Sequence, residues 1–428
     1  MVLELCSVSV EDISWGRKTI LDGTALLVHR EGLLAAAKGN DHRITSVKAF
    51  IARPGESVRI LPVKDVIEPR VKVEGKGGMF PGLISGVETV GTGRTHALRG
   101  CAVVTAGQVV GVQEGLIDMS GPGAHYSPFS RTLNIVLAVN VKYGTSPHEH
   151  EEALRLAGLR AAVYLGEAGR NAKPVDVERF EVRSPFTPKR GNADLPGIVY
   201  VYMLLSQGLL HDTYLYGQNA TSLLPTLIMG TEIMDGAIVS GNCVSACDKN
   251  TTYHHQNNPV VRELFKRDGI DLRFLGTVVG NCNVTLPAKL RAAQYGVKLV
   301  EFLCADGAVI TKEGFGNPDA DAMMYCAGLE QMGIRTVMIT DEFAGVDGAS
   351  QSLADTTPRA DAVVSTGNAN ERILLPPMEK VIGDMRVIER MAGGQSGSIS
   401  QEGITVELQA ILGATNELGF EFLSAREE

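Results

Sequence analysis

Residues 241–244, Gly241-Asn242-Cys243-Val244, place a thiol directly after an asparagine in a glycine-flanked turn that closes the apolar run 236–240. The Cys243 thiol can attack the carbonyl carbon of Asn242, and this intramolecular reaction is fast if the turn twists the peptide bond out of its resonance-stabilised plane. β-Elimination from the resulting thioester, followed by hydrolysis, leaves a pyruvoyl group at a new N-terminus. The dipeptide therefore raises the hypothesis of self-cleavage. In the alternative interpretation, Cys243 is a small buried apolar residue at a strand end.

Several side chains that follow this bond are candidates for proton transfer or metal binding. Ser245, Lys249 and His254 are possible proton carriers, although Lys249 and its neighbour Asp248 also fit a solvated turn pair. Cys243 and Cys247 have a C-x3-C spacing that, with His254 and His255, resembles a set of zinc ligands. One cysteine pair is weak evidence, and two adjacent histidines direct their side chains apart. We therefore expect no metal here.

The residues from 193 onward alternate between apolar strands and amphipathic helices. This pattern is typical of an α/β domain with a largely parallel sheet. The plainest helices span residues 287–302 and 319–332. The expected strands are residues 198–202, 237–239, 274–279, 308–310, 336–339 and 362–364.

Polar and reactive side chains follow these expected strands. In open parallel sheets the ligand lies beyond the carboxyl ends of the strands. Glu313 and Asp341 are therefore predicted to bind substrate at the edge that Asn242-Cys243 shares, close to a second thiol, Cys282. The alternative is that strand ends are polar because loops are polar.

The part of the chain before residue 193 has a different pattern. Residues 1–145 are predicted to form a β-rich N-terminal domain, because short Val/Ile/Leu runs alternate with Gly and Pro. Residues 146–192 are predicted to be a connecting helix and linker. Ser146 caps the helix, Pro147 occupies its first position and Glu149 completes a capping box. Residues 193–428 then form the α/β domain that carries the cleavage site.

Composition limits the classes of ligand. The chain has 428 residues and a formal net charge of -9, which argues against a nucleic-acid or anionic-membrane surface. It has no uninterrupted apolar run of the ~20 residues that a membrane helix needs. Its N-terminus lacks the features of an export signal, so we expect a cytoplasmic protein. The seven scattered cysteines fit reduced thiols better than disulfides. The expected ligand is a small molecule.

Long blocks across nearly the whole chain resemble the proprotein of the substrate-binding component B of glycine/sarcosine/betaine reductases. They are KDVIEPRVKVE (64–74), QEGLIDMSGPG (113–123), QGLLHDTY (207–214), GAIVSGNCVSACDKN (236–250), GFGNP (314–318) and DGASQSLAD (347–355). In that family the proprotein is split before a cysteine, and the C-terminal chain begins with a pyruvoyl group. The resemblance implies chains 1–242 and 243–428, with Cys243 as the precursor of the pyruvoyl cofactor.

The resemblance also implies a mechanism and partners. A ketone carbonyl condenses with the substrate amine to give an iminium, which weakens the C–N bond toward a nucleophile. The family supplies that nucleophile as selenocysteine on another subunit of component B. The carboxymethyl group then passes to the small selenoprotein A, and component C releases acetyl phosphate.

The sequence leaves the substrate and two rival functions open. Glycine and sarcosine can form an iminium, whereas the quaternary nitrogen of betaine has no lone pair, and we favour glycine. In one rival the chain stays intact as a thiol- or metal-dependent enzyme that uses Cys243 or Cys247. In the other it is a non-catalytic assembly subunit of the reductase complex.

Overall fold

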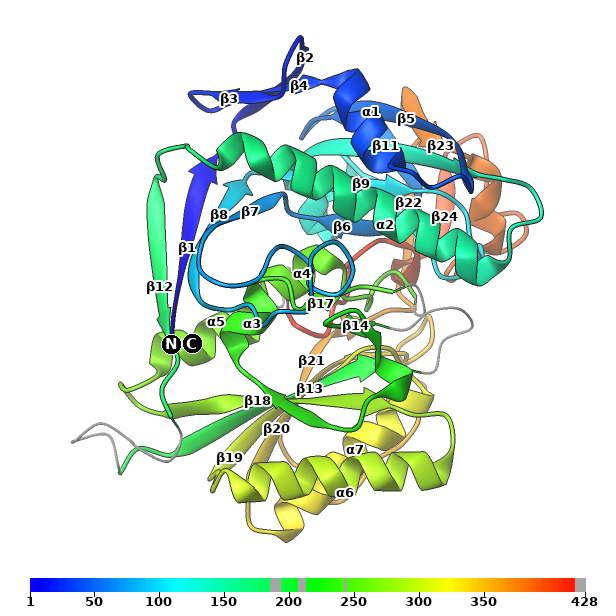
Figure 1. Cartoon of the computed structure of the whole chain (residues 1–428). Coiled ribbons are helices and arrows are strands. Elements are labelled where there is room, and N and C mark those ends of the chain that lie inside the picture. Colours follow the sequence, from blue (N-terminus) through cyan, green and yellow to red (C-terminus); the bar gives the residue numbers. More distant parts are fainter. Residues whose placement is uncertain (185–193, 207–212, 242–244, 420–428) are drawn as a thin grey trace.

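The computed structural model describes residues 1–184, 194–206, 213–241 and 245–419. Within these ranges the chain is a mixed α/β protein, as the sequence predicts, and two six-stranded sheets dominate it (Figure 1). The predicted cleavage bond Asn242-Cys243 lies outside the described residues. The predicted domain boundaries, at 145/146 and 192/193, stay predictions.

The first large sheet is formed mainly by residues before 145. Its strand order is β10-β6-β9-β11-β5, and β23 also pairs with β6, at residues 58–61. All ten residues of β6 are buried, which places this strand in the interior. The strands are β5 (Ile44–Ala52), β6 (Val58–Ile67), β9 (Cys101–Ala106), β10 (Gly115–Asp118), β11 (Leu133–Val141) and β23 (Lys380–Gly383).

Helix α2 (Pro147–Gly166) covers one face of this sheet (Figure 1). Its start confirms the predicted capping box, because the Ser146 side chain accepts from the Glu149 amide and the Glu149 side chain accepts from the Ser146 amide. A Cβ on Gly158 would lie 2.2 Å from Thr105 Oγ1, so glycine allows the close approach to β9. The Lys64 ammonium lies 2.8 Å from Glu151 Oε1 and ties β6 to the helix.

Smaller elements surround the first sheet. A four-stranded sheet has the order β12-β1-β8-β7, and a three-stranded sheet has the order β2-β4-β3. Helix α1 (Arg30–Lys38) follows β4. The strands are β1 (Val2–Ser9), β2 (Asp12–Gly16), β3 (Ile20–Asp22), β4 (Ala25–His29), β7 (Arg70–Glu74), β8 (Gly93–Arg99) and β12 (Asp176–Glu181).

The second large sheet confirms the predicted α/β pattern. Its order is β16-β18-β13-β19-β20-β21; all of its neighbouring strands run parallel except β16, which is antiparallel to β18. Helices α6 (Leu286–Phe302) and α7 (Asn317–Gln331) pack side by side on one face (Figure 1). The strands are β13 (Gly197–Leu205), β16 (Thr226–Ile228), β18 (Arg273–Cys282), β19 (Gly307–Lys312), β20 (Arg335–Glu342) and β21 (Val363–Asn368).

One predicted strand belongs to a different sheet. Residues 237–239 were expected in the parallel sheet, but β17 (Ile238–Val239) pairs antiparallel with β14 (Tyr214–Leu215), which also pairs with β15 (Gln218–Asn219). The prediction is wrong because a short apolar run has the same pattern in either sheet. The cleavage candidate therefore follows a strand of a small antiparallel sheet.

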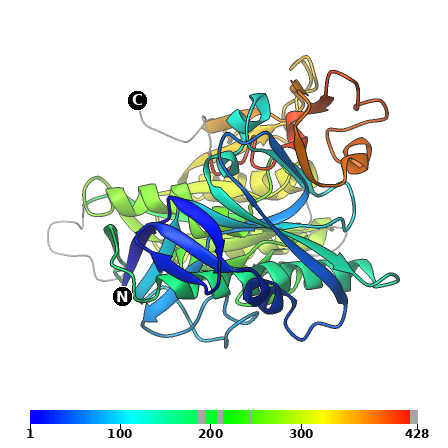
Figure 2. The same ribbon diagram turned by 90° about the horizontal axis from the view of Figure 1, so that it is seen from above.

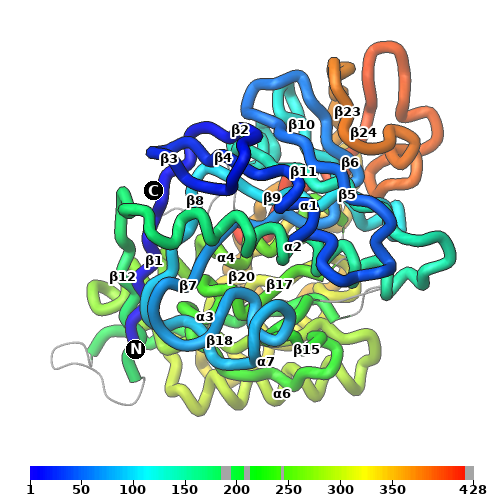
Figure 3. Tube along the Cα trace, turned by 45° about the horizontal axis from the view of Figure 1, so that its top comes forward, coloured from blue at the N-terminus to red at the C-terminus, as the bar shows by residue number. Residues whose placement is uncertain are grey.

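The chain returns to the first sheet after β21. Strand β23 runs parallel to β6, and the orange segment that contains it lies beside the blue and cyan strands of the first sheet (Figures 2 and 3). The nearby strands β22 (Arg372–Leu375) and β24 (Ile404–Glu407) form a two-stranded sheet. Residues far apart in sequence thus share one interior.

Three short helices lie between the two large sheets in Figure 1: α3 (Gly230–Met234), α4 (Thr252–Gln256) and α5 (Pro259–Arg267). Among the described residues, no helix combines the length and the apolar character that crossing a membrane requires.

Candidate functional site

The carboxyl ends of β19 and β20 bring together the two acids that the sequence predicts at this edge. Lys312 is the last residue of β19 and Glu313 follows it, Asp341 lies near the end of β20, and all three side chains are buried. The Lys312 ammonium lies 2.9 Å from Asp319 Oδ1 at the start of α7 and donates to Gly314 O at 2.6 Å. The parallel strands β19 and β20 end at one edge, as predicted, while the substrate-binding roles of Glu313 and Asp341 and the predicted nearness of Asn242-Cys243 to this edge stay predictions.

The Glu313 carboxyl group already accepts hydrogen bonds from other residues of the chain. Its Oε2 accepts from the Leu205 amide at 3.0 Å and from Thr213 Oγ1 at 2.5 Å. These donors come just before and just after residues 207–212. Glu313 therefore holds Leu205 and Thr213 beside the end of β19.

Residues 245–258 pass through the interior between the two large sheets. Ser245 Oγ donates to Gln409 Oε1 at 3.3 Å, and the Cys247 amide donates to Gln409 O at 3.3 Å. Further along, the amide and hydroxyl of Thr252 donate to the buried Asp65 of β6 at 2.9 and 2.7 Å. This segment thus connects β6 of the first sheet to Gln409, which lies far along the chain.

Cys247 and Asp248 meet Asp341 in this interior. The Cys247 thiol donates to Asp341 Oδ2 at 3.9 Å, and Thr415 Oγ1 donates to the same oxygen at 3.2 Å. One potential ligand atom from each of Cys247, Asp248 and Asp341 lies within 4.8 Å of the others. Neither carboxylate oxygen of the fully buried Asp248 has a hydrogen-bond partner among the described residues.

Burial controls the electrostatics of this group of side chains. Burial raises the pKa of Asp341 to about 6, against the opposing effects of Lys312 and Thr415. Burial, and then repulsion from Asp341, raises the pKa of Asp248 well above its usual value. The pKa of Lys312 is raised because its attraction to Asp319 and to Asp341 outweighs the cost of burying its charge.

Lys249 and His254 occupy positions that the sequence did not indicate. The solvated turn pair is wrong, because Lys249 and Asp248 are both buried, and Lys249 Nζ donates to Lys64 O of β6 at 2.6 Å. His254 belongs to the cap of α4, where its Nδ1 accepts from the Thr251 amide at 3.1 Å. Burial lowers the pKa of His254 to about 3, so its ring is neutral at pH 7. The proton-carrier roles of Ser245, Lys249 and His254 stay predictions.

The potential metal ligands near Cys247 differ from the cysteine and histidine set that sequence spacing suggested. His255 Nδ1 forms a 2.6 Å hydrogen bond with Tyr202 Oη, and His254 Nδ1 faces Thr251. Among the described residues, the group with metal-ligand spacing contains Cys247, Asp248 and Asp341. Sequence reasoning paired Cys247 with histidines because it had only spacing to use.

Sequence reasoning missed four buried charged residues of this region: Asp248, Lys312, Asp319 and Glu417. The position of Lys312 at the end of an apolar strand was an available signal for it, as it was for Glu313. Asp248 was considered only as the partner of Lys249. Glu417 gives no local signal, because it reaches this region from the far end of the chain and accepts from Asn250 Nδ2 at 2.7 Å.

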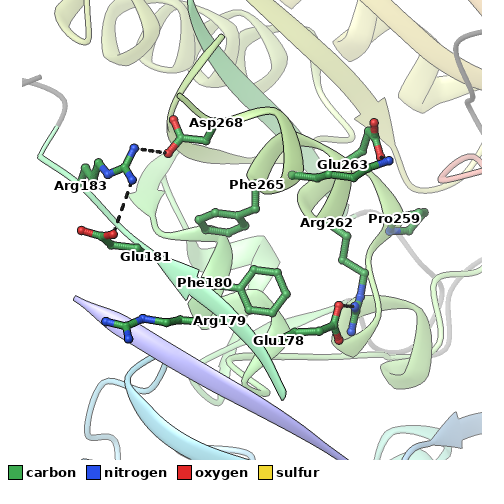
Figure 4. A pocket seen from close by; sticks show the side chains of 11 residues that line it. Glu178, Arg179, Phe180, Glu181, Arg183, Pro259, Arg262, Glu263, Phe265 and Asp268 are labelled. Atoms are coloured by element: carbon green, nitrogen blue, oxygen red, sulfur yellow. Dashed lines mark hydrogen bonds and ion pairs between the residues drawn. The ribbon is translucent and has the colours of Figure 1, made fainter. Parts of the chain in front are cut away.

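A surface pocket of about 630 Å³ lies between β12 and α5 (Figure 4). Its charged side chains pair with one another: Arg183 contacts Asp268 at 3.3 Å and Glu181 at 3.5 Å, and Arg262 pairs with Glu178. None of the described residues that line it is a predicted site residue. The buried region around Cys247 and Asp341 is therefore the better candidate site.

Comparison with known proteins agrees with the sequence blocks. The family described as "Glycine/sarcosine/betaine reductase component B subunits" matches residues 1–426. The "Glycine reductase complex component B subunits alpha and beta" of Peptoclostridium acidaminophilum are 54% identical over 100% of both chains. The sarcosine reductase complex component B subunit alpha of that organism is 51% identical over 100% of both chains. Its betaine reductase complex component B subunit alpha is 38% identical over 93% of this chain and 91% of the relative.

No solved structure matches the chain. The match to the family is nevertheless continuous from residue 1 to residue 426, and it includes every described part of the candidate site. The chain belongs to the family of glycine/sarcosine/betaine reductase component B subunits.

Proposed function

We propose that this chain is the precursor of the substrate-binding, pyruvoyl-containing subunit of a glycine or sarcosine reductase, and that it cuts itself between Asn242 and Cys243. The observation that carries the proposal is a single-chain relative, 54% identical over its whole length, whose name covers two subunits, alpha and beta. One polypeptide that yields two subunits must be cut. The Asn-Cys bond supplies a nucleophile and a carbonyl for that cut.

The described residues on either side of the bond support this assignment. Ser240 is buried, and its amide donates to Thr252 Oγ1 at 3.1 Å. On the other side, Ser245 and Ala246 are buried, and Ser245 is bound to Gln409. Both flanks are therefore anchored in the interior. Anchored flanks favour a reaction within the chain over one between chains.

The same residues fit a pyruvoyl group at position 243. The group would supply an electrophilic carbonyl for the substrate amine. Gln409 would hold the new chain start through Ser245 and through the Cys247 amide. The buried carboxyl side chains Asp248, Asp341 and Glu417 lie in the interior beyond this position, and their oxygens can accept hydrogen bonds from an amine.

The partners and substrate follow from the family. We propose that a selenocysteine-containing subunit of component B attacks the activated substrate, that small selenoprotein A accepts the carboxymethyl group, and that component C releases acetyl phosphate. A primary or secondary amine fits a carbonyl cofactor, whereas the quaternary nitrogen of betaine does not. Identity to the glycine and sarcosine relatives, at 54% and 51%, also exceeds that to the betaine relative, at 38%.

The decisive experiment is intact-mass measurement of the denatured protein isolated from its native complex. We expect two chains, 1–242 and 243–428, and phenylhydrazine labelling at the start of the second. Cys243→Ala should remain one unlabelled chain. The matched control Cys304→Ala, which changes an exposed cysteine, should be cut normally.

Three outcomes would contradict the proposal. An active native complex with an unbroken chain and an unmodified Cys243 sulfur supports an intact thiol- or metal-dependent enzyme. Normal cleavage of Cys243→Ala means that a different bond is cut. Two chains that take up no carbonyl reagent point to a non-catalytic assembly subunit.

A further inference from the structure

The buried side chains around Cys247 carry far more acid than base. Asp248, Glu313, Asp319, Asp341 and Glu417 influence one another electrostatically, and the Lys312 ammonium lies within 4.0 Å of two of them, Asp319 and Asp341. These five carboxyl groups are at most 2% exposed. Buried carboxylates are costly unless they are paired, protonated or bound to a metal. Lys312 alone does not balance them.

The excess of buried carboxyl groups over ammonium groups is greatest near Cys247. Lys312 already contacts Asp319 and Gly314, and it reaches Asp341 only through Oδ1, at 4.0 Å. The other oxygen, Asp341 Oδ2, faces the Cys247 thiol and Thr415. The Asp248 carboxylate, fully buried, contributes two oxygens that have no hydrogen-bond partner among the described residues. These oxygens and the Cys247 sulfur are therefore potential ligands for a cation.

We propose that Cys247, Asp248 and Asp341 bind a zinc-class divalent metal ion that anchors the segment after residue 244 to the end of β20. The spacing fits: the ligand atoms lie within 4.8 Å of one another, and Cys247 Sγ lies 3.9 Å from Asp341 Oδ2. In a tetrahedral zinc site, sulfur and oxygen ligands lie about 3.5 Å apart. A contraction of about 1 Å therefore closes the site around an ion.

The types of ligand atom, one sulfur and carboxylate oxygens, determine which metal ion fits the site. A thiolate with two carboxylates suits zinc and related transition metals, whereas Mg²⁺ and Ca²⁺ prefer an all-oxygen shell. Binding requires the Cys247 thiol to lose its proton to solvent. Glu417 is the additional acid, because its Oε2 is buried and has no hydrogen-bond partner among the described residues, and it interacts electrostatically with Asp248 and Asp341. It or a water molecule would complete the shell.

Thr415 acts as a positioning residue. Its hydroxyl donates to Asp341 Oδ2, the oxygen that faces Cys247, and so fixes the orientation of that carboxylate. Partners of this kind typically change metal affinity about 10-fold or more when they are removed. Thr415→Val keeps the side-chain shape and removes the donor.

The test measures metal in the full chain after passage through metal-free buffer. We expect about one zinc-class ion per chain in the wild type. Cys247→Ala and Asp248→Asn should lose it, and Thr415→Val should weaken its binding about tenfold. The matched control Cys326→Ala, which changes another buried cysteine, should retain the ion. Replacement by Co²⁺ should give a thiolate-to-cobalt absorption band that Cys247→Ala lacks.

Two kinds of result would overturn the proposal. If the native wild-type protein takes up neither Zn²⁺ nor Co²⁺, protons neutralise the carboxyl groups instead. Full metal content in folded Cys247→Ala and Asp248→Asn, or a cobalt spectrum without the thiolate band, places the ion elsewhere. If Cys247→Ala fails to fold by circular dichroism, Asp248→Asn and the Thr415→Val affinity decide. Cys243→Ala should keep its metal, which separates this test from that of self-cleavage.

Discussion

Tyr202 and His255 form a buried hydrogen bond in which Tyr202 Oη lies 2.6 Å from His255 Nδ1. It connects β13, a central strand of the parallel sheet, to α4 in the segment that follows the cleavage candidate. Asn250 Nδ2 also donates to Tyr202 Oη, at 3.1 Å. The imidazole in this contact is neutral at pH 7, because burial and the neighbouring His254 lower the pKa of His255 to about 3.

Acid should destabilise the folded protein by protonating His254 and His255. Their pKa values are about 3 in the folded chain and about 6.5 when unfolded. Between these values the unfolded state binds more protons, so the free energy of unfolding falls as pH drops from 6.5 toward 3. Each histidine contributes at most about 1.4 kcal/mol per pH unit. Urea denaturation at a series of pH values measures the slope.

The matched variants are His255→Asn and, at an exposed position, His42→Gln. His255→Asn should reduce the dependence of unfolding free energy on pH in this range, besides lowering stability at pH 7. His42→Gln should leave the slope unchanged. Equal slopes in wild type and His255→Asn would show that His255 titrates normally in the fold.

The two proposed chains should stay together after cleavage. Strand β23 of the second chain pairs with β6 of the first, and Arg59 Nη2 donates to Pro376 O at 3.1 Å. Asp65 accepts two hydrogen bonds from Thr252 across the same junction. Native mass spectrometry should find one species that contains both chains, and denaturant should separate them. Separate elution in native buffer would contradict this expectation.

Asp65→Ala should weaken that association. It leaves the amide and hydroxyl of Thr252 without their buried acceptor, at a cost of about 1–3 kcal/mol for each unsatisfied group. The chains should therefore separate at a lower urea concentration than in wild type. The control Glu11→Ala changes an exposed acid and should have no effect.

Glu313→Ala should destabilise the fold by about 1–3 kcal/mol for each donor, because the Leu205 amide and the Thr213 hydroxyl lose their buried acceptor. Urea denaturation measures the loss. Glu301→Ala, at an exposed position of α6, is the control and should change stability little. A Glu313→Ala protein as stable as wild type would show that these two hydrogen bonds contribute little.

Covalent capture should distinguish the substrates. Labelled glycine or sarcosine, incubated with the processed protein and cyanoborohydride, should attach to the chain that begins at position 243. Betaine should not attach, because its quaternary nitrogen has no lone pair. Cys243→Ala should capture none of the three. Labelling by betaine equal to that by glycine would exclude capture through the amine.

The sequence by itself determined the features that contiguous residues encode. Apolar periodicity located β13, β18, β19, β20, α6 and α7, and three residues at 146–149 predicted the cap of α2. The long sequence blocks determined the family. Strand ends also predicted that Glu313 and Asp341 lie at one edge, because the direction of parallel strands fixes where they end.

Only the tertiary structure decided which side chains meet in the interior. The 94 positions between Cys247 and Asp341, and the 167 between Asn250 and Glu417, are bridged by packing that leaves no periodic signal in the sequence. The same is true of β17, whose short apolar run fits either sheet until its partner is known. Burial then decides the chemistry, because an Asp or His side chain changes its preferred charge state when its neighbours replace water.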